Sequence, residues 1–141
     1  MREILFRGQT RRLGEKVWMN GEKVPSNWVY GGICCGKGAF SIIYDYMDEE
    51  KEKPIEKHVV YTDTIGQYTG LTDKNGKKIF EGDIVDITYP ETIVRNALVT
   101  YVGASFYGDN GNDLWVFDDY ISFEVIGNIH DNPELLKGGA E

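Results

Sequence analysis

A glycine-rich string at residues 31–38, GGICCGKG, is the part of this sequence closest to a known catalytic motif. Its spacing matches the phosphate-binding loop of nucleotide hydrolases, which ends in Gly, Lys and a hydroxyl residue that holds Mg²⁺. Here Gly38 stands where the hydroxyl residue is needed, and residues 39–44, AFSIIY, have the pattern of a strand. The motif requires a helix at that place, because a helix N-terminus must face the phosphates. The string therefore predicts a hairpin turn between two strands and no nucleotide site.

Residues 109–113, DNGND, offer oxygen ligands that suit a hard cation such as Ca²⁺. The helix-loop-helix calcium template requires Gly at its sixth position and Glu at its twelfth, but Leu114 and Tyr120 occupy them. A polar turn explains the same residue types. Zinc is not favoured either, because two adjacent cysteines and two distant histidines, His58 and His130, give neither the number nor the spacing of its ligands. We expect no metal and no cofactor.

Carboxylates remain as candidates for acid-base chemistry, since the chain has 23 acidic residues. Asp83, the pair Asp118-Asp119 and the pair His130-Asp131 have nothing around them that separates a catalytic role from a solvated or capping one. No Ser, Cys or Lys lies in a nucleophile motif. The sequence predicts that the protein is not an enzyme. A hydrolase or transferase that uses carboxylates is the alternative, and it requires a deep pocket joining two acids of unequal pKa.

The formal charge of −8 is unevenly distributed along the chain. Residues 1–23 carry six basic and three acidic side chains, whereas residues 105–141 carry eight acidic and one basic. A general binder of phosphate backbones needs a clustered positive surface, so we expect no nucleic acid partner. An acidic mimic of nucleic acid that inhibits a host enzyme is a second alternative, which requires acids in a regular array on one surface.

The two cysteines and the N-terminus indicate the compartment. Cys34 and Cys35 are adjacent, so their side chains would point to opposite faces of a strand and cannot easily bridge each other. The first residues lack the apolar run of a signal peptide, and no apolar stretch approaches the about 18 residues that a membrane helix requires. We expect a cytoplasmic protein without a membrane partner.

Short apolar runs separated by Gly, Asn and Pro predict a mainly β fold. Asn20-Gly21 favours a hairpin turn, and the charged residues 48–57 divide the chain. We expect a β-rich N-terminal part at residues 1–60 and a small barrel at residues 61–141. The alternative is that the two parts form one continuous domain. In the second part Gly82-Asp83 leads into an alternating strand, and Asn132-Pro133-Glu134 predicts a short C-terminal helix. The glycine-aspartate entry into a strand is similar to that of SH3-like barrels.

A strand at residues 114–117, LWVF, is apolar on both faces, with Trp115 and Phe117 on one and Leu114 and Val116 on the other. Such a strand is covered either by its own fold or by another subunit. We expect Leu114, Trp115, Val116 and Phe117 to form an interface between copies, with Tyr120 at its margin. The alternative is that Trp115 belongs to the core.

Four separated segments together carry a resemblance: residues 2–8, 28–31, 65–85 and 123–136. They resemble the YopX-like proteins of phages and prophages, and the likeness spans nearly the whole chain. This family has no established biochemical activity, so no catalytic residues carry over. The resemblance implies a phage-encoded accessory protein of the bacterial cytoplasm that assembles from several copies. Together with the absence of a catalytic motif, it favours a self-associating module that binds another macromolecule of host or phage.

Overall fold

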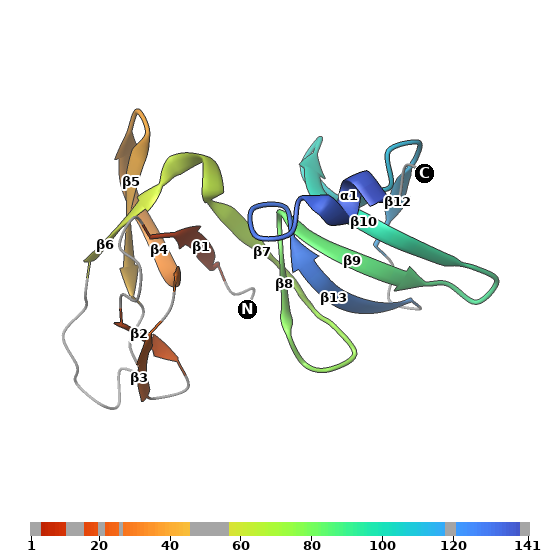
Figure 1. Ribbon diagram of the computed structural model, residues 1–141, viewed down its shortest axis with the longest axis horizontal. Helices are drawn as coiled ribbons and strands as arrows, with labels where there is room; N and C mark the ends of the chain where they lie inside the picture. Colours follow the sequence, from red (N-terminus) through yellow and green to blue (C-terminus); the bar gives the residue numbers. More distant parts are fainter. Residues whose placement is uncertain are drawn as a thin grey trace. The chain divides into compact units, whose positions relative to one another are not determined.

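The computed structural model describes residues 4–10, 16–19, 22–25, 27–45, 57–117 and 121–138 (Figure 1). The chain divides into two compact units, Met1–Gln67 and Tyr68–Glu141. Both are built almost wholly from antiparallel strands, so the predicted mainly β class is confirmed. The sequence placed the division near residue 60; that each part is a separate domain stays a prediction.

The first unit contains a sheet in which β6, β5, β4 and β1 are neighbours in that order, and Gly66 and Gln67 at the start of β7 pair with the other side of β1. Its strands are β1 (Phe6–Gln9), β4 (Trp28–Lys37), β5 (Phe40–Asp45), β6 (Lys57–Tyr61) and β7 (Gly66–Thr72), and the short helix η2 (Thr62–Thr64) joins the last two. Val29, Ile43 and Val60 are fully buried and form its core. A Cβ on Gly8 would lie 2.9 Å from Val60 Cγ2, so this glycine lets β1 lie close to β6.

Two predicted hairpins lie in this unit. β2 (Lys16–Met19) and β3 (Glu22–Pro25) pair antiparallel with Met19 opposite Glu22, whereas the Asn20-Gly21 turn itself lies outside the described residues. β4 and β5 pair with Lys37 opposite Phe40, and Gly38 between them has a φ of 66°. The glycine-rich string is thus the end of one strand and a tight turn, as its sequence predicts.

The second unit has a five-stranded antiparallel sheet with the order β12-β11-β10-β9-β13. β7 leads through β8 (Lys78–Phe80) into β9 (Asp83–Thr88), β10 (Ile93–Val102), β11 (Ser105–Asp109), β12 (Leu114–Val116) and β13 (Ser122–Asn128). The predicted C-terminal helix is present as α1 (Glu134–Gly138). Over the described residues this sheet is open, with β12 and β13 as its edges, so no closed barrel is seen and the SH3-like detail is unconfirmed.

One face of this sheet carries the core of the second unit. The face follows from the alternation of strands: on β9 Val85 and Ile87 are buried, and on β10 Ala97 and Val99 are buried. Ile79, Val94 and Phe123 complete the cluster. A Cβ on Gly108 would lie 2.7 Å from Ile87 Cδ1, so β11 needs glycine at this point to lie over the core.

Candidate functional site

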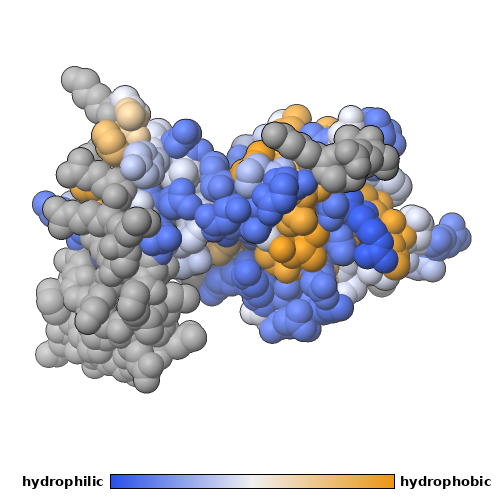
Figure 2. All heavy atoms as spheres, viewed as in Figure 1, coloured by the Kyte–Doolittle hydropathy of each residue, from blue (hydrophilic) through white to orange (hydrophobic). Residues whose placement is uncertain are grey.

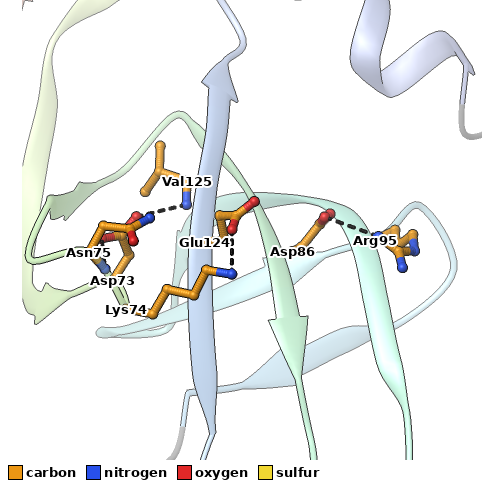
Figure 3. A network of polar contacts seen from close by, with 7 residues as sticks. All are labelled: Asp73, Lys74, Asn75, Asp86, Arg95, Glu124 and Val125. Atoms are coloured by element: carbon orange, nitrogen blue, oxygen red, sulfur yellow. Dashed lines mark hydrogen bonds and ion pairs between the residues drawn. The ribbon is translucent and has the colours of Figure 1, made fainter.

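Asp73, in the turn between β7 and β8, is a nearly buried acid with 7% exposure. Its Oδ1 accepts hydrogen bonds from the backbone N–H groups of Asn75 and Lys77, both at 2.9 Å, and its Oδ2 accepts one from Val125 at 3.1 Å. Figure 3 shows this carboxylate between its own turn and β13. Burial by itself raises the pKa of Asp73, but the three N–H donors and the nearby charge of Lys77 lower it by more, so the net pKa is lowered. Asp73 is therefore an ionised structural group.

Lys74 attaches the same turn to β13 a second time. Its backbone N–H donates to the Phe123 carbonyl at 2.9 Å, and its Nζ lies 2.6 Å from Glu124 Oε2. The hydrogen bond and the charge of Glu124 raise the pKa of Lys74 above 10.5. Together with the hydrogen bond from the Val125 N–H to Asp73, these contacts cover the edge of β13 that does not pair with β9. Most of β13 lies in residues 123–136, one of the segments that carry the family resemblance.

Asp86 and Glu124 are the carboxylates whose placement most resembles the acid pair of an enzyme, because they are directly opposite each other on β9 and β13. They line an open hollow of about 210 Å³. Asp86 Oδ2 accepts from Arg95 Nη1 at 3.3 Å, and Glu124 accepts from Lys74, as the dashed lines in Figure 3 show. Each carboxylate is paired with a cation, so the arrangement does not make one of them a proton donor and the other a proton acceptor.

Asp83 is a structural acid as well. It is 1% exposed, and its Oδ2 accepts from the backbone N–H of Phe80 at 2.8 Å, which closes the turn into β9. Gly82, with a φ of 93°, donates its N–H to Val99 and accepts from Ile129 through its carbonyl. The Gly-Asp step thus joins three strands of the unit rather than presenting an acid to solvent.

His130 and Asp131 belong to a turn and are exposed. Asn128 Oδ1 accepts from both of their backbone N–H groups, at 3.0 and 2.9 Å, and Asn128 Nδ2 donates to Asp131 Oδ2 at 3.0 Å. A Cβ on Gly127 would lie 2.6 Å from Asn132 Oδ1 and 3.0 Å from Leu135 Cδ1, so a side chain here would displace both where this turn folds back. These contacts give the Asn and Gly residues of the conspicuous end segment a role in holding this turn together.

The DNGND segment forms a turn whose backbone N–H groups donate to the side chains of Asp109 and Asn110. Asp109 Oδ1 accepts from the Gly111 N–H, and Asn110 Oδ1 accepts from Asn112 and Asp113. Gly111 has a φ of 92°. The turn borders an open hollow of about 480 Å³, which Arg95, Asn96, Leu98 and Leu136 also line. In the described part of the chain no three His, Cys, Asp or Glu residues are grouped as metal ligands.

The predicted interface segment has two different faces. Leu114 and Val116 are 49% and 63% exposed. Trp115 and Phe117 are half-buried and pack against the core, with Trp115 5.3 Å from the ring of Tyr89 and Phe117 4.7 Å from that of Phe123. Tyr120 lies outside the described residues. In the structure Leu114 and Val116 are therefore exposed, while the two aromatic side chains contribute to their own fold.

Strand pairing places further apolar side chains beside this exposed pair. Val116 is opposite Tyr107 of β11, which is opposite Thr100 of β10. In the next row Leu114 is opposite Asp109, which is opposite Leu98. On the other side of Thr100 along β10, Val102 is 48% exposed. We call this surface the outer face of β10–β12; it includes Leu98, Thr100, Val102, Tyr107, Leu114 and Val116, with Asp109 between Leu98 and Leu114. Sequence reasoning missed its β10 and β11 members, although the alternation around buried Val99 could have indicated them.

A comparison with protein-family models matches residues 26–137 to the YopX protein family. The matched region extends from just before β4 into α1 and includes the Asp73 turn, Gly82-Asp83 and the turn around Asn128. A search of curated proteins finds no match. Among the described residues, none of the helices has the length and apolar character needed to cross a membrane.

Proposed function

Because the chain belongs to the YopX protein family, we propose that it is a phage-encoded accessory protein that self-associates and binds another macromolecule without catalysing a reaction. We place its action in the cytoplasm of the bacterial host. The proposal joins two observations. The acids and glycines that make the family segments conspicuous hold turns together, and the exposed side chains of Val102, Leu114 and Val116 lie on one face of the second unit's sheet.

The outer face of β10–β12 is the observation that carries the proposal. An antiparallel sheet with one solvated face ordinarily alternates apolar and polar residues, yet here the outward positions include Leu98, Val102, Leu114 and Val116. In Figure 2 apolar surface, coloured orange, interrupts the hydrophilic surface of the unit that contains β9, β10 and α1. Leu114 and Val116 are neighbours on this face and both are exposed, and exposed apolar side chains grouped in this way favour an interaction surface.

Neither alternative function has a comparable observation in its favour. A carboxylate enzyme would need two acids with unequal tasks, whereas Asp86 and Glu124 are each paired with a cation in an open hollow. An acidic mimic of nucleic acid would need an uninterrupted array of negative charge. On this part of the sheet Lys74 and Arg95 alternate with the acids.

Light scattering tests the self-association. We expect a mass well above the 16.0 kDa of one chain, and a return toward that mass for the double variant Leu114→Ser/Val116→Ser. Ile93→Ser is the matched control, because Ile93 is an equally exposed apolar side chain on β10. A wild-type mass of one chain would refute self-association.

Recovery of the tagged protein from phage-infected cells tests the second half of the proposal. The wild type should enrich a partner macromolecule that the double variant loses and the Ile93→Ser control keeps. If all three recover the same material, the outer face does not bind a partner.

A further inference from the structure

The two edge strands of the five-stranded sheet differ in what covers them. The edge at β13 is covered, because the Asp73-Lys74 turn bonds to Val125 and Phe123. At the other edge β12 pairs only with β11 among the described residues. An uncovered edge presents unpaired backbone N–H and C=O groups to any strand that approaches.

β12 also lacks most of the usual protections of an exposed edge. Its sequence, LWV, contains no charge and no proline, and its pairing with β11 runs from Asp109 opposite Leu114 to Tyr107 opposite Val116 without a bulge. Natural edges are protected by lysine, proline, bulges or a very short strand, and of these β12 has only its short length of 3 residues. The hydroxyl of Tyr89 donates to the Val116 carbonyl at 3.1 Å. Without a charge, a proline or a bulge, β12 can accept a further strand at its edge.

We propose that β12 pairs antiparallel with β12 of a second copy, so that two five-stranded sheets join into one across a two-fold axis at Trp115. This rests on the self-association proposed above and states how it is made. In this register Leu114 of one copy is opposite Val116 of the other, twice. The outer faces then continue into each other through the row Tyr107, Val116, Leu114 of the second copy.

The charges next to the strand favour this register and this partner. Asp113 precedes β12 and would be opposite Phe117 of the second copy, so the acids are not directly opposed. Parallel pairing would instead place Asp113 against Asp113, which is destabilising. A two-fold axis requires a self-complementary surface, and Leu-Trp-Val centred on Trp115 has one, since both outward positions are apolar.

Disulfide trapping tests the register. In a background with Cys34→Ser and Cys35→Ser, the variants Leu114→Cys and Val116→Cys are oxidised separately and as an equimolar mixture. We expect the mixture to form covalent dimer at least about tenfold faster than either variant alone, because only unlike residues are directly opposite. Equal rates, or no trapping, would overturn the pairing.

The mass of Val116→Lys provides an independent measurement. The lysine should lower the assembled mass, while Ile93→Lys should not, and circular dichroism checks that both variants keep their strands. If the wild type is itself a single chain, self-association and β12 pairing both fail. If the wild type is assembled but Val116→Lys leaves its mass unchanged and the mixture does not trap, self-association stands and the β12 pairing is wrong.

Discussion

Replacing Asp73 with Asn should destabilise the second unit far more than an ordinary surface change. The amide oxygen of Asn can still accept from Asn75 and Lys77. The amide nitrogen, however, replaces the oxygen that accepts from Val125 and would face its N–H, donor against donor. The exchange therefore removes one bond completely and turns the other two from charged into neutral ones.

The magnitude follows from these three bonds. A hydrogen bond to a charged group contributes about 1.5–3 kcal/mol, and losing the charge roughly halves each bond that remains. Allowing for overlap among these effects, we expect a loss of about 2–4 kcal/mol in the free energy of unfolding. For a unit of the size of residues 68–141, this corresponds to a fall in Tm of roughly 10–25 °C.

Hydrogen exchange followed by mass spectrometry during urea unfolding is the suitable assay, because it reports the second unit separately from the first. Asp109→Asn is the matched control. Asp109 accepts one N–H, from Gly111, at an exposed position, and an amide oxygen can accept the same bond, so we expect less than about 0.5 kcal/mol. The reasoning is refuted if the two variants shift the unfolding midpoint equally.

The same acid should make stability depend on pH at low pH. The pKa of Asp73 is lowered in the folded protein, so its contribution is complete above the ordinary value of 3.8 and is lost as the pH falls through the lowered value. The difference in stability between wild type and Asp73→Asn should therefore narrow below pH 3.8. Urea titrations at a series of pH values measure it, and a constant difference would contradict the mechanism.

Three further predictions concern single contacts. Gly108→Ala should cost about 1–3 kcal/mol, because its Cβ would lie 2.7 Å from Ile87 Cδ1, and Ile87→Val should rescue part of that loss in a double-mutant cycle. Asn96 has a φ of 54°, a conformation that glycine adopts more easily than alanine, so Asn96→Ala should be less stable than Asn96→Gly by about 1 kcal/mol in the free energy of unfolding. Its urea midpoint should be lower, and equal midpoints would contradict the backbone argument. Lys74→Met should lower the midpoint slightly at low salt and not in about 1 M salt, where the Debye length is about 3 Å. Because Glu124 raises the pKa of Lys74, any stability from the pair is present below pH 10.5 and lost as the pH rises through the raised value.

The sequence by itself predicted local structure wherever a few neighbouring residues decide the backbone conformation. The turn at Gly38 needs a positive φ, the proline before α1 suits a helix start, and Val85 and Ile87 share a face by alternation. Each of these depends on intrinsic backbone preferences or on the two-residue period of a strand. The mainly β class follows from the same signals.

Only the tertiary structure decided what these elements do for one another. Asp73 reads as one residue of a polar turn, but its carboxylate reaches the N–H of Val125, 52 residues later, and so covers one edge of the sheet. Alternation placed Trp115 and Leu114 on opposite faces without saying which faces the core; the pairing of β12 with β11 settled that. The physical reason is that a strand's period is local, whereas its register and its neighbours are set by side chains that meet only after the chain has folded.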